Sequence, residues 1–242
     1  MSIEIDNLNK VLDQIDKIGD KEWIGSLNER KLKELQFHDR DRDSNHIEKS
    51  KANDTYEKFY GNKKYYSTTV RSKDFVNNWI KRESKNKVFL DYACGNGFNA
   101  IMAAECGASL SLGFDISGVS VQNARKSAKE KYLKNIRFFQ ADAENTKLPD
   151  NCIDTVICSG MLHHLDLNFA FPELKRILKP GGKILAVEAL DYNPLIKMYR
   201  LLTPDMRTEW EKGHILSLKD VRFAKEFFEI GNINYWHITS YA

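Results

Sequence analysis

The sequence has little of what marks a secreted, membrane-spanning or nucleic-acid-binding protein. Its 242 residues include only four cysteines, none in the C-x-x-C spacing typical of metal and redox motifs. No apolar run approaches the roughly 20 residues that cross a bilayer, and the N-terminus lacks a signal-peptide pattern. The 37 basic and 34 acidic residues leave a net charge of only +3, which does not indicate a nucleic-acid-binding surface. We therefore expect a cytoplasmic protein with reduced thiols, no membrane span and no nucleic-acid partner.

A short glycine-rich segment organises the rest of the chain. The apolar run 88–90 is followed by Asp91, then by Gly95-Asn96-Gly97, and then by a helix-compatible stretch over 99–105. This order predicts a strand, a tight loop and a helix. Glycines let a backbone approach a ligand closely, and a new helix presents free N–H groups. The segment therefore predicts a site for a nucleotide-like cofactor.

Two classes of cofactor fit this loop. Gly95-x-Gly97-x-x-Ala100 matches the dinucleotide fingerprint, but such a fingerprint alone is weak evidence. Asp91 precedes the glycines, where its carboxylate would repel a pyrophosphate and attract a sulfonium or an ammonium group. The position of this acid favours a cationic cofactor over NAD.

Polar residues follow the next three predicted strands. Asp115 ends the strand expected over 109–115, 24 positions after Asp91, and a carboxylate there can accept hydrogen bonds from both hydroxyls of a ribose. Alternatively, Asp115 is only an acid at a helix N-terminus or a charged residue in a loop. Asp142 follows the strand expected over 135–140, with a turn residue as the alternative. The strand over 152–158 leads into a tract that contains His163 and His164.

Together these motifs resemble those of class I S-adenosylmethionine-dependent methyltransferases of the small-molecule type. The resemblance covers roughly residues 70–190 and includes the string Leu178-Lys179-Pro180-Gly181-Gly182, a turn that leads into a fifth strand. Ala93 stands where the commonest family form has glycine. The resemblance implies an α/β fold, with a Rossmann-like doubly wound sheet and an N-terminal helical arm.

The resemblance also implies a cofactor and its ligands. S-adenosylmethionine would be the methyl donor and S-adenosylhomocysteine the product. Asp91 and the glycine loop would hold the methionine end, Asp115 the ribose and Asp142 the adenine. The full predicted set is Asp91, Ala93, Gly95, Gly97, Asn99, Asp115, Ile116, Asp142, Ala143, Ser159 and Gly160.

Acceptor contacts are predicted from the remaining polar and aromatic residues. One of His163 and His164 is a candidate base, with positioning or packing as the alternative; adjacent histidines should point in different directions, so at most one should face the pocket. Tyr65 or Tyr66 would cap the sulfonium or line the acceptor pocket. Arg207 and His214 are candidate acceptor contacts, with surface or structural roles as the alternative. No metal site is predicted.

The flanking regions are expected to cover the core. Residues 1–70 form a helical arm or lid, and residues 71–242 form the methyltransferase domain, with a helical cap at about 192–230. Helices are expected over 1–18 and 26–37, and the alternating charges over 37–43 are expected to be a solvated face. A sixth strand is expected over 233–241. The usual seventh strand has no counterpart, so either the fold is trimmed or the natural chain continues.

The sequence thus predicts methyl transfer to oxygen, nitrogen or carbon of a small molecule. Enzymes that methylate adenine amino groups carry Asn/Asp-Pro-Pro-aromatic after the fourth strand, and this chain does not. A methyltransferase acting on RNA or protein and a module that binds the cofactor without catalysis are the alternatives. A dehydrogenase is a third, more distant alternative.

Overall fold

A five-stranded parallel sheet forms the centre of the protein in this computed structural model, which describes residues 2–42, 70–190, 198 and 208–236. The strands are β1 (Val88–Tyr92), β2 (Leu110–Asp115), β3 (Ile136–Gln140), β4 (Ile153–Ser159) and β5 (Leu178–Val187). Their order is β3-β2-β1-β4-β5. The chain therefore reverses its direction of travel between β1 and β4, and sheets of this kind bind ligands at the carboxyl ends of the strands beside that switch. The predicted α/β doubly wound fold is confirmed.

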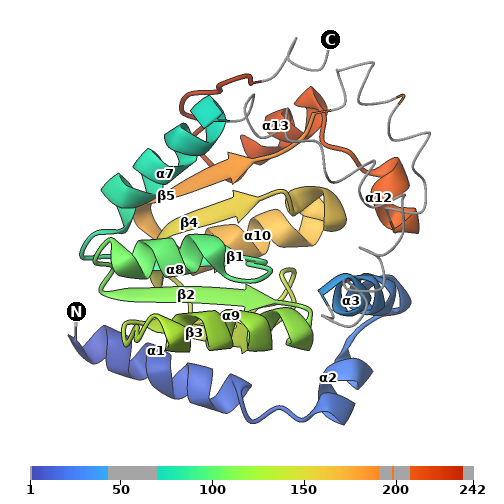
Figure 1. Ribbon diagram of the computed structural model, residues 1–242. Helices are drawn as coiled ribbons and strands as arrows, with labels where there is room; N and C mark the ends of the chain where they lie inside the picture. Colours follow the sequence, from blue (N-terminus) through green and yellow to red (C-terminus); the bar gives the residue numbers. More distant parts are fainter. Residues whose placement is uncertain (1, 43–69, 191–197, 199–207, 237–242) are drawn as a thin grey trace.

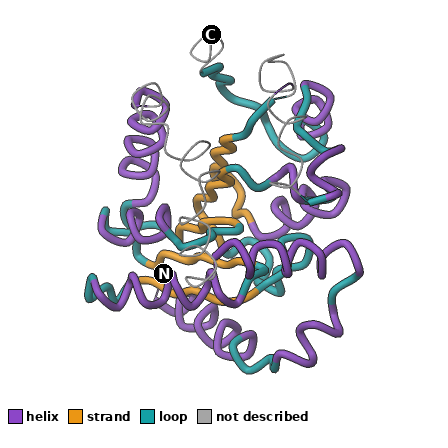
Figure 2. The backbone as a smooth tube through the Cα atoms, turned by 45° about the vertical axis from the view of Figure 1, so that its right-hand side comes forward, coloured by secondary structure: helices purple, strands orange, loops and turns teal. Residues whose placement is uncertain are grey.

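Helices cover both faces of the sheet (Figures 1 and 2). These are α7 (Val70–Ser84), α8 (Phe98–Glu105), α9 (Gly118–Glu130) and α10 (Leu167–Ile177). Every residue of β1 and β2 is buried, as expected for parallel strands with two covered faces. None of the described helices has the length and apolar character needed to cross a bilayer.

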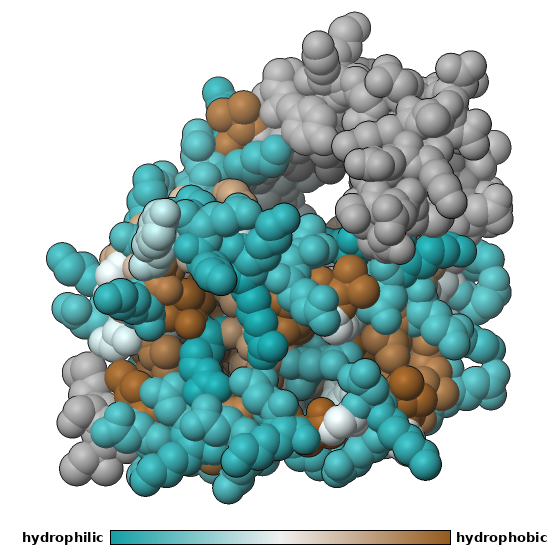
Figure 3. Space-filling view, turned by 60° about the horizontal axis from the view of Figure 1, so that its bottom comes forward, coloured by the Kyte–Doolittle hydropathy of each residue, from teal (hydrophilic) through white to brown (hydrophobic). Residues whose placement is uncertain are grey.

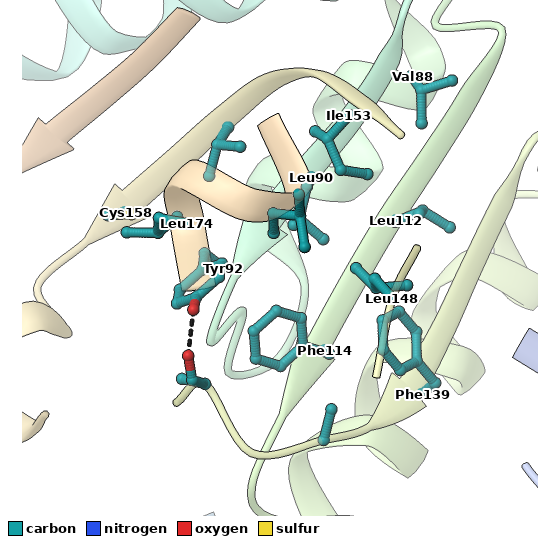
Figure 4. Packing of buried hydrophobic residues seen from close by; sticks show 14 of the residues in the cluster. Val88, Leu90, Tyr92, Leu112, Phe114, Phe139, Leu148, Ile153, Cys158 and Leu174 are labelled. Atoms are coloured by element: carbon teal, nitrogen blue, oxygen red, sulfur yellow. Dashed lines mark hydrogen bonds between the residues drawn. The ribbon is translucent and has the colours of Figure 1, made fainter. Parts of the chain in front are cut away.

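Side-chain alternation along β1 divides the core into two sides. Val88, Leu90 and Tyr92 pack in one large cluster with α10 (Figure 4). Phe89 instead packs with residues of α7 and α8. Alternation along a strand sends the side chain of Asp91 to the same side as Phe89, toward α8. This placement decides what the acid can contact.

The N-terminal arm contains three described helices. These are α1 (Ser2–Ile15), α2 (Asp20–Ser26) and α3 (Glu29–Arg42). Leu8, Leu12 and Ile15 of α1 are buried in the same cluster as β1, so the predicted apolar spacing corresponds to a real contact. The surface seen from the α1 side is mainly hydrophilic, with apolar residues in small separate groups (Figure 3).

Helix α3 differs from its prediction. It begins later than expected and continues through the charged segment to Arg42, and it lies at the end of the sheet to which the strands point (Figure 1). The segment from 37 to 42 is therefore not simply a solvated face: the Oγ atom of Ser117 donates a hydrogen bond of 2.5 Å to Asp39. Asp39 thus has a polar partner in the loop after β2.

The C-terminal region contains α12 (Glu209–Gly213) and α13 (Leu218–Ala224). These two short helices are the described part of the predicted cap. Residues 233–236, at the start of the expected sixth strand, are irregular, and the rest of that segment lies outside the described residues. Ile233, Tyr235 and Trp236 are exposed, so their alternating pattern does not correspond to a buried strand face.

Candidate cofactor and acceptor site

A pocket of about 230 Å³ lies at the carboxyl ends of the strands, and α3 forms one wall. Eight of the predicted cofactor residues line it: Ala93, Gly95, Asp115, Ile116, Asp142, Ala143, Ser159 and Gly160. They come from the loops after β1, β2, β3 and β4. Parallel strands bring these loops to one edge, so residues separated by many positions in the chain meet in one place.

Asp115 joins the first two of these loops. Its Oδ2 atom accepts a hydrogen bond of 2.8 Å from the backbone N–H of Gly95, and its Oδ1 atom accepts one of 2.9 Å from that of Ser117. Each carboxylate oxygen has a further lone pair available for a ligand. The backbone of Gly95 has a φ of +52°, which glycine adopts without steric cost.

Asp142 and Glu144 lie in the loop after β3, where they pair with α3. Lys31 Nζ lies 2.6 Å from Asp142 Oδ2 and 2.9 Å from Glu144 Oε2. Arg30 also pairs with Glu144 and donates a hydrogen bond of 2.8 Å to the carbonyl of His164. Burial disfavours the charge of Lys31, but the hydrogen bonds to the two acids prevail and raise its pKa. These ion pairs fasten α3 over the loop after β3.

Asp91 lies behind the glycine loop instead of on the pocket surface. Its side chain is on the α8 side, where Asn99 Nδ2 donates to Oδ1 at 3.2 Å and the N–H of Ala100 donates to Oδ2 at 3.1 Å. The residue is 2% exposed. Burial raises its pKa to about 7, although both hydrogen bonds act in the other direction. In this structure Asp91 anchors the start of α8, and its role at the methionine end of the cofactor stays a prediction.

Gly97 and Asn99 also do not line the pocket. A Cβ atom on Gly97 would lie 2.6 Å from the Phe138 ring, and its φ is +78°. Gly97 is thus needed for packing of the loop against the sheet. Ala93 does line the pocket and has a φ of +53°, a conformation that suits glycine better.

His163 and His164 lie on a short 3₁₀ turn, η1 (Leu162–His164). Only His164 lines the pocket. The two ring centroids are 4.3 Å apart, but the rings contact different carboxylates, Glu188 and Glu34. His163 Nδ1 donates a hydrogen bond of 2.9 Å to Glu188, whose other oxygen accepts from the backbone N–H groups of Met161 and Leu162. His163 is therefore tied into the turn, whereas His164 faces the pocket.

A buried carboxylate of α3 contacts His164 from the opposite wall. Glu34 Oε2 lies 3.1 Å from His164 Nδ1 and 3.7 Å from His38 Nε2. Its Oε1 accepts a hydrogen bond of 2.5 Å from Thr208 Oγ1. Burial opposes ionisation of Glu34, but the hydrogen bonds from His164 and Thr208 lower its pKa. Burial lowers the pKa of His38, and the nearby His164 adds to this effect.

The remaining acceptor predictions have different outcomes. His214 is exposed, stacks on Trp210 with ring centroids 3.6 Å apart, and hydrogen-bonds the Trp210 carbonyl at 2.7 Å. It does not line the pocket. Tyr65, Tyr66 and Arg207 lie outside the described residues.

Sequence reasoning missed the contributions of α3 to the pocket. Five of its residues line the cavity: Arg30, Lys31, Glu34, His38 and Arg42. Most recur at intervals of three or four, which places them on one face of a helix. Such a polar stripe ordinarily faces solvent, so nothing in the sequence distinguished it from a surface.

The chain is similar to known methyltransferases in sequence and in fold. Residues 83–227 match a family model described as a methyltransferase domain. YcgJ, an uncharacterized methyltransferase of Bacillus subtilis, is 34% identical over 104 residues, which are 41% of this chain and 39% of YcgJ. Its solved structure has a TM-score of 0.53 at 25% identity and covers 64% of this chain and 67% of that one.

Two other relatives have named substrates. A demethylmenaquinone methyltransferase from a Geobacillus strain is 35% identical over 107 residues, which are 43% of this chain and 46% of the relative. A ribosomal protein L11 methyltransferase from Burkholderia lata is 32% identical over 107 residues, 44% of this chain and 33% of the relative. The chain thus spans less than half the length of these curated relatives.

The family match covers more than half of the chain. It includes the glycine loop, the acids after β2 and β3, and the tract with the two histidines. The order of the strands and the positions of these motifs agree with the match. The chain belongs to the class I S-adenosylmethionine-dependent methyltransferases.

Proposed function

We propose that the protein binds S-adenosylmethionine in this pocket and transfers its methyl group to a small-molecule acceptor. The residues present fit such a cofactor. Asp115 presents a carboxylate with available lone pairs to a ribose, and Asp142 offers an acceptor to an adenine amino group. Ser159 at the end of β4 and Gly160 and His164 beyond it line the pocket, beside the position where the methyl group would leave.

The contacts between three elements on the acceptor side of the pocket support the small-molecule assignment. Helix α3, the turn η1 and helix α12 meet there: Arg30 bonds the His164 carbonyl, and Thr208 at the start of α12 bonds Glu34 of α3. A wall joined in this way would suit a compact acceptor better than a folded macromolecule, which would need an open approach.

The sulfonium supplies an already activated methyl group, so the protein has to align the acceptor, exclude water and receive a proton where the acceptor needs to lose one. The nucleophile, which is an oxygen, nitrogen or carbon atom, forms the new bond to the methyl carbon as the carbon–sulfur bond breaks. S-adenosylhomocysteine is the second product. His164 faces the pocket and is the better placed of the two histidines to receive the proton.

Transfer of a labelled methyl group tests this proposal. The protein is incubated with methyl-labelled S-adenosylmethionine and, separately, with the small-molecule, protein and RNA fractions of a cell extract. We expect label only in the small-molecule fraction, and less of it with an Asp115→Ala variant when the cofactor is below saturation. Label in protein or RNA instead would refute the acceptor class while leaving methyl transfer intact.

The relatives include enzymes with protein and with small-molecule acceptors, so a protein acceptor is the alternative. The similarity to a ribosomal protein L11 methyltransferase would predict label in the protein fraction. The similarity to a demethylmenaquinone methyltransferase would predict label in the small-molecule fraction. A cofactor-binding module without catalysis would bind S-adenosylhomocysteine tightly in calorimetry and label nothing. Binding of NAD alone would refute the whole assignment.

We further propose that residues 1–70 act as an arm that closes the site, because α3 already forms one of its walls.

All four cysteines carry free thiols, which supports a reducing, cytoplasmic location.

A further inference from the structure

We propose that Glu34, His38 and His164 form a binding site for a divalent transition-metal ion on the acceptor wall of the pocket. The role of the ion rests on the proposed methyl transfer, whereas binding of the ion does not depend on it. Two imidazoles and one carboxylate are a ligand set that suits ions such as Zn²⁺, Fe²⁺ or Mn²⁺. No metal was predicted from the sequence, because α3 and η1 are 130 positions apart along the chain at the Glu34–His164 contact.

The spacing of the three ligand atoms fits a coordination shell. Ligands bound at about 2.1 Å in tetrahedral or octahedral geometry lie roughly 3.0–3.5 Å from one another. Glu34 Oε2 lies 3.1 Å from His164 Nδ1 and 3.7 Å from His38 Nε2. All three ligand atoms lie within 4.8 Å of one another, so small side-chain rotations bring them around one ion.

Glu34 has a hydrogen-bond partner of the kind that orients metal-ligating carboxylates. Thr208 donates a hydrogen bond to the oxygen that does not face the histidines, and such bonds orient a ligating carboxylate. In the described part of the chain, the ion pairs recorded for Glu34 are with histidines alone. The nearby Lys31 is instead paired with Asp142 and Glu144. An incoming cation would therefore meet a buried carboxylate that has no lysine or arginine partner there.

A second group, His163, His164 and Glu211, is also close enough to share an ion. Its geometry is less suitable. His163 Nε2 lies 3.9 Å from Glu211, and its other nitrogen is held by Glu188 in the turn. Glu34, His38 and His164 all line the pocket, whereas His163 and Glu211 do not. Only the first group can present an ion to a ligand in the pocket.

This position suggests what the ion does and which acceptor it selects. An ion with three protein ligands has at least one open position, which faces the pocket. With the ion bound at Nδ1, His164 could no longer receive the acceptor's proton. An acceptor hydroxyl bound to the ion would instead lose its proton to solvent, because the cation stabilises the alkoxide or phenolate. The oxygen lone pair then forms the bond to the methyl carbon while the carbon–sulfur bond breaks. The site therefore favours an oxygen acceptor over a nitrogen or carbon acceptor.

Calorimetric titration of the untagged, chelator-treated protein with ZnCl₂ and with MnCl₂ tests the site without methyl transfer. We expect binding of one ion, weakened at least about tenfold in Glu34→Gln and in His38→Gln. His163→Gln is the matched control, since it removes the adjacent histidine and should retain the parent affinity. Thermal melts of each variant show whether it is folded, and Glu34→Gln keeps an oxygen that can accept from Thr208.

Titration with CoCl₂ gives a second readout through its absorption spectrum. Cys94 also lines the pocket, and a thiolate ligand would add an intense sulfur-to-cobalt band in the near ultraviolet. We expect visible bands without that sulfur band. No binding, equal binding by parent and Glu34→Gln, loss in His163→Gln, or a sulfur band would each overturn the site. Titration with S-adenosylhomocysteine is done separately, so failure of the cofactor assignment is distinguishable from failure of the metal site.

Discussion

The buried carboxyl group of Asp91 should make the stability of the protein depend on pH. Its pKa is about 7 in the folded protein, against 3.8 for an unperturbed Asp side chain. Between these two values the folded state holds a proton that the unfolded state has released, so unfolding releases a proton. The free energy of unfolding therefore falls as pH rises, and it levels off above pH 7.

The size of the effect follows from the same two values. Each pH unit between them changes the free energy of unfolding by about 1.4 kcal/mol. From pH 5 to pH 8 the parent protein should therefore lose about 3 kcal/mol through this one group. Asp91→Asn has no proton to exchange, and its side-chain oxygen can still accept from the N–H of Ala100. The stability of the variant relative to the parent should rise by the same amount over this range.

Urea denaturation of both proteins at pH 5, 6, 7 and 8 measures this difference. Asp6→Asn serves as a control for the change in net charge, because Asp6 is exposed on α1. The reasoning would be refuted by a difference between Asp91→Asn and the parent that stays constant with pH, or by one that Asp6→Asn reproduces.

Three further predictions concern the pocket and the glycine loop. Asp115→Ala should weaken S-adenosylhomocysteine binding by about 1–3 kcal/mol in calorimetry, and an unchanged dissociation constant would contradict the ribose assignment. Gly97→Ala should destabilise the protein by more than about 2 kcal/mol in urea, since a Cβ would lie 2.6 Å from an aromatic ring; Gly231→Ala, with open space around it, is the control and should have little effect. His164→Ala should lower kcat at saturating cofactor more than His163→Ala, because only His164 lines the pocket; equal losses would count against this distinction.

The sheet and the residues at its carboxyl edge could be predicted because their signals are local. Apolar runs ending in an acid or a turn marked each strand, and the predicted starts and ends of β1 to β4 differ from the structure by a residue or so. Once the strands are known to be parallel, their following loops must converge. This is why residues as distant as Gly95, Asp115 and Asp142 were expected together and do line one pocket.

The side of the sheet to which Asp91 points can be inferred from the alternation of side chains along the strand. Asp91 lies between Leu90 and Tyr92, and in a strand neighbouring side chains point to opposite faces. Leu90 and Tyr92 share one core cluster, so the acid had to face the other side, where α8 begins. The contact of Asp91 with the cofactor was predicted from the motif alone, and it stays a prediction.

The contribution of α3 had no such signal, and it changes how the site is understood. Lys31, Glu34 and His38 recur on one helical face, which hydropathy alone would place in solvent. The structure turns that face to the pocket, where Lys31 pairs with the acid predicted to hold adenine and Glu34 with the histidine nearest the acceptor. The proposed cofactor and acceptor regions would thus be contacted by successive turns of one helix. A ligand that shifts α3 at Lys31 would also shift Glu34, so we expect occupancy of one part of the pocket to change affinity at the other.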